Sequence, residues 1–145
     1  MDDLYREYIL EHYNNPLNFG QLEDPTFEAE GQNPTCGDEL HVQVRLSADG
    51  ATIDEVRFTG QGCAISQAAM SILSERLTGM PVEELAGLDR DWMLELLGIQ
   101  LSPARIKCGV LGMVVVRTGW ARHSGSAAPD GWEGMDELAW SGGAG

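Results

Sequence analysis

Three cysteines and one aspartate form the group in this 145-residue chain whose types and spacing could do chemistry. Cys36, Cys63 and Cys108 have 26 and 44 residues between them, and the lack of a C-x-x-C pair excludes a zinc-finger knuckle and a thioredoxin-type redox pair. Together with Asp38 they offer three thiolates and one carboxylate. Such a donor set suits zinc, ferrous iron or an iron–sulfur cluster.

The surroundings of two cysteines favour a ligating thiol. Cys36 lies in a loop that leads into a predicted strand, where Gly37 permits a tight turn and Asp38 can turn its carboxylate toward the thiol. Cys63 stands at a predicted helix start, where free backbone N–H groups should lower its pKa. For any single cysteine, the alternative is a small buried hydrophobic residue.

The third cysteine follows two basic side chains. Arg105 and Lys107 precede Cys108 near the start of another predicted helix, and both should stabilise its thiolate. Three Cys and one Asp around Zn²⁺ leave a formal charge of −2, which these two cations would partly offset.

The elements that must position these residues follow from hydrophobic periodicity. Helical spacing predicts helices over residues 2–15, 64–78, 89–97 and 103–121, with a helical turn or two over 81–86. Alternation predicts strands over 41–47 and 52–59, joined by a turn, and one short strand near 27–31. Ile53 is out of phase with Val56 and Phe58, which indicates a bulge or a frayed start.

The first helix is expected to face the core with one apolar stripe and to leave His12 at the surface. The stripe is formed by Leu4, Tyr5, Tyr8, Ile9 and Tyr13.

Composition and charge restrict the function classes. The 43% of hydrophobic residues can bury a core without disulfides, and the net charge of −14 argues against nucleic-acid or anionic-membrane partners. Such a surface suits a basic protein partner or simply favours solubility.

The sequence also indicates a location. No apolar run approaches a membrane span, and no signal-peptide layout opens the chain. An odd number of cysteines fits reducing conditions, so a cytoplasmic location is expected. Residues 1–123 are expected to form one domain, followed by an acidic, Gly-rich tail over 124–145.

Three spaced motifs point to a known family. Over about residues 2–122 the chain resembles the U-type iron–sulfur scaffold family (IscU, SufU and the N-terminal part of NifU). The motifs are Asn33-Pro-Thr-Cys-Gly-Asp38, Gly60-Gln-Gly-Cys-Ala-Ile-Ser66 and Ala104-Arg-Ile-Lys-Cys108, and the opening segment 4–16 is similar too. The resemblance implies an α+β fold, with a small antiparallel sheet of about three strands and helices packed on one side.

The resemblance also implies ligands and partners. Cys36, Asp38, Cys63 and Cys108 would meet at one exposed end and hold zinc or a [2Fe-2S]-type cluster. Sulfur would come from a cysteine desulfurase similar to SufS or IscS and pass to a downstream iron–sulfur scaffold or apo-protein. Such a protein is a sulfur acceptor and scaffold more than a turnover enzyme.

Two departures bear on the branch of the family. Lys107 stands where the IscU type usually has a His, and Leu101-Ser-Pro-Ala-Arg105 replaces its chaperone-docking segment, so the site is SufU-like and no Hsp70-type chaperone is expected. The 44 residues before Cys108 leave no room for the usual SufU insertion. The length is thus IscU-like, whereas Lys107 in place of the His favours zinc and a sulfur relay over cluster building. Cys108 is the expected first sulfur acceptor, because its thiolate is favoured by the basic neighbours, and Cys36 is the second candidate.

Two other kinds of protein fit the same donor set. A structural zinc module would unfold when its metal is removed. A zinc-dependent hydrolase would need a general base beside an open metal position, and no motif places Glu39 or His41 there. His41 and His123 are expected to be surface or packing residues.

Overall fold

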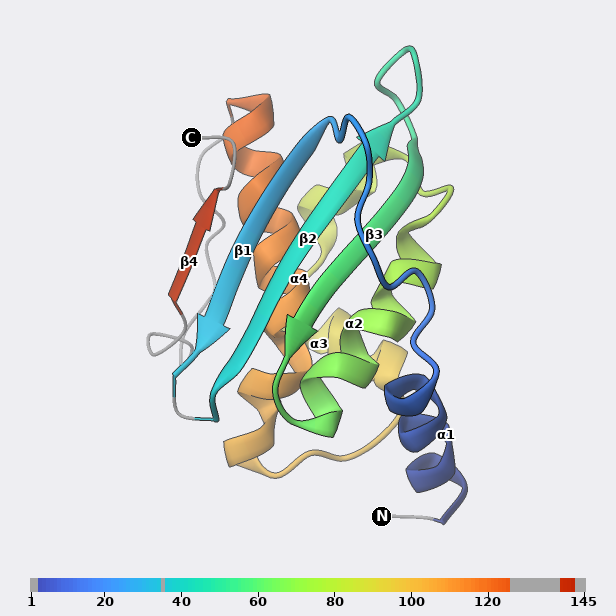
Figure 1. The fold of residues 1–145 in the computed structure, drawn as a ribbon, viewed down its shortest axis with the longest axis vertical. Helices are drawn as coiled ribbons and strands as arrows, with labels where there is room; N and C mark the ends of the chain where they lie inside the picture. The colour runs from blue at the N-terminus through green and yellow to red at the C-terminus, as the bar shows by residue number, and fades with distance from the viewer. Residues whose placement is uncertain (1–2, 35, 126–138, 143–145) are drawn as a thin grey trace.

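A computed structural model describes residues 3–34, 36–125 and 139–142 of the chain (Figure 1). The helices are α1 (Asp3–Asn14), α2 (Ala64–Leu77), α3 (Arg90–Leu97) and α4 (Pro103–Ser124), with a 3-10 helix η1 (Val82–Gly87). The strands are β1 (Phe27–Asn33), β2 (Asp38–Leu46), β3 (Ile53–Gln61) and β4 (Ala139–Gly142). All strand pairs are antiparallel, in the order β3-β2-β1-β4, so the predicted α+β class is confirmed.

The sheet has one strand more than the sequence indicated. β4 pairs with β1 from Ala29↔Gly142 to Gln32↔Ala139, and it lies within the segment 124–145 that was expected to be a tail. Residues 126–138 and 143–145 of that segment lie outside the described residues. A four-residue strand carries little periodicity, and its pairing joins residues more than a hundred positions apart, so local patterns do not reveal it.

A bulge in β3 explains the phase of its apolar residues. The register between β2 and β3 shifts after Arg45, so that Leu46 pairs with Ile53 and Asp54 is an extra residue. The shift turns both Ile53 and Val56 toward the core, where both are buried. The bulge predicted as one of two alternatives is therefore confirmed.

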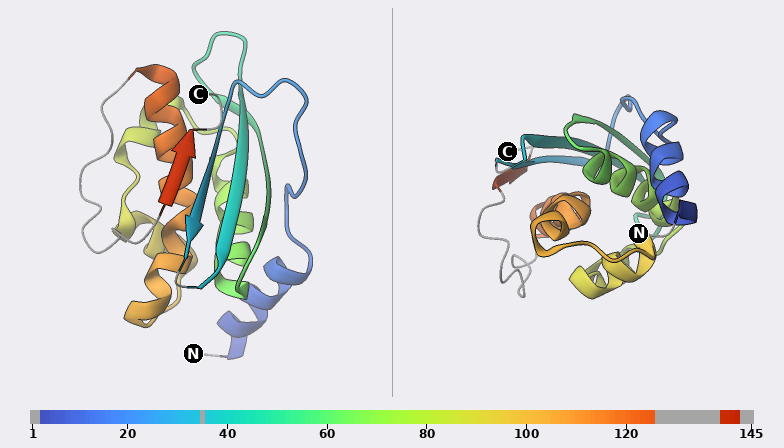
Figure 2. Two further views of the ribbon diagram at one scale, coloured as in Figure 1. Left: turned by 60° about the vertical axis from the view of Figure 1, so that its left-hand side comes forward. Right: turned by 90° about the horizontal axis from the view of Figure 1, so that it is seen from below.

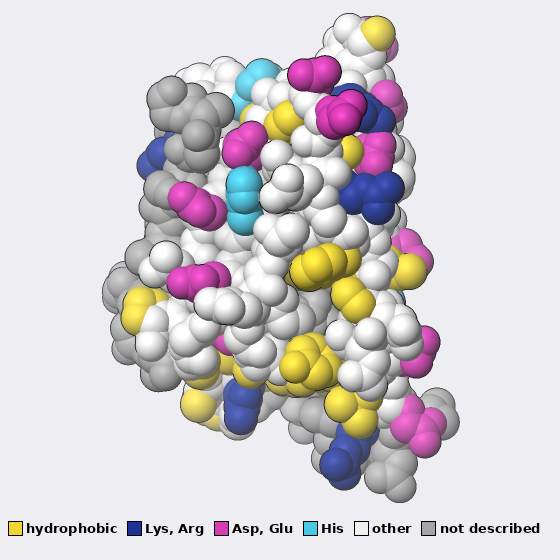
Figure 3. Space-filling model, in the orientation of Figure 1, with side chains coloured by type: hydrophobic (Ala, Val, Ile, Leu, Met, Phe, Trp, Pro, Cys, Tyr) yellow, Lys and Arg dark blue, Asp and Glu magenta, His cyan; other side chains and the backbone are white. Residues whose placement is uncertain are grey.

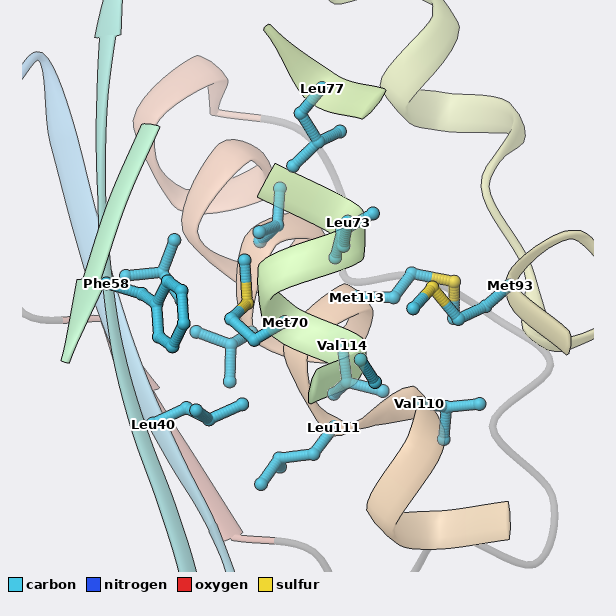
Figure 4. Packing of buried hydrophobic residues seen from close by; sticks show 14 of the residues in the cluster. Leu40, Phe58, Met70, Leu73, Leu77, Met93, Val110, Leu111, Met113 and Val114 are labelled. Atoms are coloured by element: carbon cyan, nitrogen blue, oxygen red, sulfur yellow. The ribbon is translucent and has the colours of Figure 1, made fainter. Parts of the chain in front are cut away.

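The helices form further layers on one face of the sheet. Figure 2 shows α2 and α4 against the sheet and α3 beyond them. Close packing depends on glycines of α4: a Cβ on Gly112 would meet the sulfur of Met70, and one on Gly119 would meet Phe27 and Ala29. Ten residues of β2, β3, α2, α3 and α4 are labelled in the core, namely Leu40, Phe58, Met70, Leu73, Leu77, Met93, Val110, Leu111, Met113 and Val114 (Figure 4). Among the described helices, none is long and apolar enough to cross a membrane.

The first helix packs differently from the expectation. Ile9 is buried, whereas Tyr8 and Tyr13 are 43% and 42% exposed, so the predicted core-facing stripe is wrong for both tyrosines. The reason is position: α1 lies at the edge of the fold against α2, and one neighbour covers only a narrow face of a helix. The side chains of Leu4 and Tyr5 lie outside the described ones. Figure 3 shows hydrophobic side chains gathered over this corner of the molecule.

His12 is half-buried instead of lying free at the surface. The Ser71 hydroxyl accepts the Leu17 N–H at 2.8 Å and lies within hydrogen-bond distance of His12 Nδ1, at 2.8 Å. Burial lowers the pKa of His12 below its usual 6.5, and the charges of Glu75 and Glu11 only partly oppose the shift.

The lowered pKa predicts a pH dependence of stability. Because the unfolded chain protonates His12 before the folded protein does, the free energy of unfolding should fall as pH decreases below about 6.5. His12→Asn keeps a side chain that can form a hydrogen bond with Ser71 and removes the titration, so the stability of the variant should vary less with pH over this window. Urea unfolding of both proteins between pH 5 and pH 8 measures the difference. If the free energy of unfolding changes equally with pH in the two proteins, His12 is not the group responsible.

Candidate metal centre

The end of the β1–β2 hairpin supplies two of the predicted site residues. Asn33 and Asp38 form the last pair of the ladder, and both side chains are fully buried. The loop between them carries Cys36, whose N–H donates to the Asn33 carbonyl at 3.2 Å. Gly37 has φ +71°, a conformation that favours glycine, as the sequence suggested. The hairpin thus presents an exposed thiol beside a buried carboxylate.

The turn from β3 into α2 brings Cys63 against that carboxylate. Gly62 has φ +141° and lies directly on Asp38, which leaves no space for a side chain. The N–H of Cys63 then donates to Asp38 Oδ1 at 2.8 Å. Cys63 is the N-cap of α2, yet its thiol makes no capping bond, so the sulfur is not used by the helix.

The first turns of α4 bring in the third cysteine. Ser102 precedes Pro103 at the helix start, as predicted, and Cys108 lies in the second turn, fully buried. Its Sγ is 3.5 Å from the Sγ of Cys36. Figure 1 shows the start of α4, the start of α2 and the ends of β1 and β3 at the same lower end of the molecule.

Three of the four predicted ligands meet in space. One sulfur each from Cys36 and Cys108 and a carboxylate oxygen of Asp38 all lie within 4.8 Å of one another. Two thiolates on a tetrahedral zinc at Zn–S 2.3 Å stand about 3.8 Å apart, so the 3.5 Å sulfur separation fits zinc closely. Cys63 is outside this group, but its side chain neighbours that of Cys108. The donor set therefore suits a thiophilic metal with the fourth ligand a short distance away.

The electrostatics of Cys108 differ from the expectation. Burial raises the pKa of its thiol far above the ordinary value, and the neighbouring Asp38, Cys36 and Cys63 raise it further. Arg105 and Lys107 were expected to favour the thiolate, but desolvation is the larger effect on the pKa because the sulfur is fully buried. In the metal-free protein this cysteine is a neutral thiol, and a bound cation is needed to ionise it.

A cavity of about 700 Å³ opens beside the sulfurs. Its lining consists of Asn33, Cys36, Cys63, Pro103, Ala104, Arg105 and Lys107. The two basic residues therefore line the same cavity as the thiols of Cys36 and Cys63. Cys36 is the exposed thiol of the three.

Asn33 belongs to the site, although the sequence analysis predicted no role for it beyond its place in the first motif. Its Nδ2 lies 3.4 Å from Asp38 Oδ2 and 3.7 Å from Cys108 Sγ, and donates to both. Its Oδ1 is buried without a hydrogen-bond partner. Strand alternation carried through the end of β1 would have turned Asn33 inward, because Ala29 and Gly31 are buried on the same face.

The hydrolase alternative lacks its base among the described residues. Glu39 and His41 alternate with the buried Asp38 and Leu40, so they point to the outer face of the sheet. There His41 Nε2 is 2.9 Å from a carboxylate oxygen of Glu28. His123 stacks on Phe27 with ring centroids 5.5 Å apart, so both histidines are surface or packing residues, as predicted.

Comparison with known proteins agrees with this geometry. The family profile of NifU-like N-terminal domains matches residues 4–128. The zinc-dependent sulfurtransferase SufU of Bacillus subtilis is 32% identical over 142 residues, covering 86% of this chain and 95% of that protein. The scaffold protein IscU of Aquifex aeolicus is 35% identical over 109 residues, covering 75% and 69%.

Solved structures show the same fold. The SufU of Fervidobacterium islandicum, from the SUF system, superposes with a TM-score of 0.65 at 25% identity and covers 79% of this chain and 94% of its own. The family profile spans all four candidate ligands, and the structural match spans most of the domain that carries them. The chain therefore belongs to the NifU-like N-terminal domain family, the U-type proteins of iron–sulfur cluster assembly.

Proposed function

We propose that this protein is a zinc-binding sulfur acceptor that takes sulfur from a cysteine desulfurase and relays it for iron–sulfur cluster assembly. One observation carries the proposal: an exposed thiol, Cys36, belongs to the same ligand group as the buried Asp38 and Cys108. An accessible ligand thiol is one that a sulfur donor can reach, which a solely structural site does not require. Zinc is favoured over a resident cluster by Lys107 and by the zinc dependence named for the Bacillus subtilis relative.

Zinc would be held by Cys36, Asp38, Cys63 and Cys108. Bound there, it would supply the positive charge that keeps the thiols ionised, including the buried Cys108. Cys63 would complete the set by turning its unused thiol, which neighbours Cys108, toward the others. A [2Fe-2S]-type cluster at the same ligands is the alternative, and it would be cargo.

Cys36 is the proposed sulfur acceptor, in place of Cys108. Attack on a persulfide requires the thiolate to reach a sulfur carried on another protein, and Cys36 is exposed whereas Cys108 is fully buried. The Cys36 thiolate attacks the outer sulfur of the desulfurase persulfide, a new S–S bond forms and the old one breaks. The desulfurase cysteine leaves as a thiolate, so no oxidant or reductant is consumed.

The partners belong to the same proposal. A desulfurase similar to SufS or IscS would dock at the end of the molecule where the cavity opens, with Arg105 and Lys107 beside the transferred sulfur. A downstream scaffold or apo-protein would take the sulfur from Cys36. All three cysteines are free, which supports a reducing compartment such as the cytoplasm.

The test combines metal analysis with sulfur transfer. Protein purified without oxygen should contain one zinc per chain and no acid-labile sulfide, and it should stimulate a cysteine desulfurase. Cys36→Ser should reduce sulfur acceptance to the background of the desulfurase alone, because the exposed nucleophile is lost. Mass spectrometry of the persulfidated chain measures the acceptor position. Normal acceptance by Cys36→Ser would contradict the assignment of Cys36.

Metal removal separates the remaining alternatives. The buried core is built without metal ligands, so chelation should abolish sulfur acceptance while the helical circular dichroism is kept. Unfolding on chelation would identify a structural zinc module instead. Iron with matching sulfide would identify a cluster-building scaffold.

A further inference from the structure

We propose that Asn33 is the positioning residue of the metal centre and selects the thiolate that accepts sulfur. The inference rests on the proposed function, because it assigns a role toward the zinc and the sulfur acceptor. Asn33 is not itself a ligand. It would act through the ligands that it contacts, by fixing their geometry and by lowering the reactivity of one of them.

The contacts of Asn33 reach three of the four ligand residues. Its side-chain amide donates to Asp38 Oδ2 and to Cys108 Sγ. Its backbone carbonyl accepts the N–H of Cys36. Asp38 in turn accepts the N–H of Cys63 through its other oxygen. Asn33 and Asp38 therefore connect strand β1, the hairpin loop and the starts of α2 and α4 in one hydrogen-bond network. Partners of this kind orient metal ligands before the metal arrives.

The orphaned oxygen of Asn33 supports a functional role. Burying an amide with one unpaired acceptor costs stability, and an apolar side chain of similar size would avoid that cost. The amide nevertheless turns its N–H groups to Asp38 and Cys108, the two ligand residues that would both carry negative charge in the metal-bound site. The orientation thus matches the charged, metal-bound state of the site.

The same contacts distinguish the two neighbouring sulfurs. A hydrogen bond donated to a thiolate takes up part of its charge and lowers its nucleophilicity. Asn33 Nδ2 donates to Cys108 Sγ, whereas its contact with Cys36 is through the backbone. Cys36 is thereby left as the more reactive thiolate, although the two sulfurs are only 3.5 Å apart.

The experiment compares Asn33→Leu and Asn33→Ala with the natural protein. Leucine fills the volume of asparagine without donors, and alanine removes both volume and donors. Gln32→Ala is the matched control, because Gln32 is the exposed neighbour on the same strand. Zinc affinity is measured by competition with a chromogenic chelator, ligand geometry by the absorption of the Co²⁺ protein, and thiolate selection by the ratio of Cys36 to Cys108 alkylation in the zinc-loaded protein. Circular dichroism of the metal-free proteins checks that each variant folds.

We expect both Asn33 variants to bind zinc about 10- to 100-fold more weakly, to change the Co²⁺ spectrum, and to shift alkylation toward Cys108. Gln32→Ala should match the natural protein. If Asn33→Ala does not fold, Asn33→Leu decides the matter. Unchanged affinity and alkylation ratio in Asn33→Leu would overturn the inference, because packing alone would then explain the residue. If the natural protein binds no zinc, the proposed function fails and this inference with it; if it binds zinc and the variants equal it, only this inference fails.

Discussion

Asp38→Ala is expected to lose metal binding and part of the folding stability together. The carboxylate is fully buried, offers one oxygen to the ligand group and accepts N–H groups from Cys63 and Asn33. Its removal leaves the part-buried Cys63 N–H and one N–H of the buried Asn33 amide unpaired, which should lower the free energy of unfolding by about 2–4 kcal/mol. Zinc affinity should fall by about 100-fold or more, because Asp38 is both a proposed ligand and the hydrogen-bond acceptor that orients the other ligand residues. Chelator competition and urea unfolding of the metal-free protein measure the two effects.

Two further variants separate these effects. Asp38→Asn keeps an oxygen for the Cys63 N–H and should recover part of the stability but not the metal affinity. Asp54→Ala removes the same charge at the exposed bulge of β3 and should change neither quantity. Zinc affinity retained in Asp38→Ala would remove Asp38 from the ligand set. Iron and sulfide retained more firmly in that variant would instead indicate a cluster-building scaffold with Asp38 as a labile ligand.

Gly62→Ala is expected to damage both the fold and the metal site. A Cβ at this position would approach Asp38, with its Cα 2.7 Å away, and the φ of +141° is one that L-residues rarely adopt. Backbone strain and overpacking together should cost about 2–5 kcal/mol. Because the clash displaces Asp38 from the Cys63 N–H, zinc affinity should fall as well. Thermal unfolding and chelator competition test both expectations.

Two other glycines provide controls that separate backbone strain from overpacking against Asp38. Gly50 has φ +74° with open space around it, so Gly50→Ala reports the conformational strain alone, about 1–2 kcal/mol. Gly87 has open space and an ordinary φ, so Gly87→Ala should change stability by less than about 0.5 kcal/mol. Equal losses in Gly62→Ala and Gly50→Ala would show that contact with Asp38 is unimportant.

Local sequence signals predicted the elements that carry the site. Ser102 and Pro103 mark the start of α4, and the phase of Ile53 against Val56 indicated a bulge or a frayed start, of which the structure shows the bulge. These features depend on residues within a few positions of one another, where backbone preference and side-chain alternation act directly. The spacing of the cysteines excluded alternatives but could not show that they meet.

The misjudged features are those that depend on distant parts of the chain. Tyr8 is exposed because α1 has one helical neighbour, and β4 forms because the edge of β1 is available to it. Cys108 holds its proton because the fold buries its sulfur, an effect that exceeds the two basic neighbours visible in the sequence. In each case the decisive contacts come from residues that are distant in the sequence, which a local pattern does not include.

The sequence by itself determined which residue types could bind a thiophilic metal, the order of the elements that carry them, and the resemblance of its motifs to one family. Only the tertiary structure decided that Cys36 is the exposed sulfur, that Cys108 is buried beside it, and that Asn33 links the ligands. The physical reason is that side-chain types and short-range spacing are fixed by covalent order. Burial and hydrogen bonding at this site instead depend on residues 75 positions apart being brought together by the packing of α4 against the sheet.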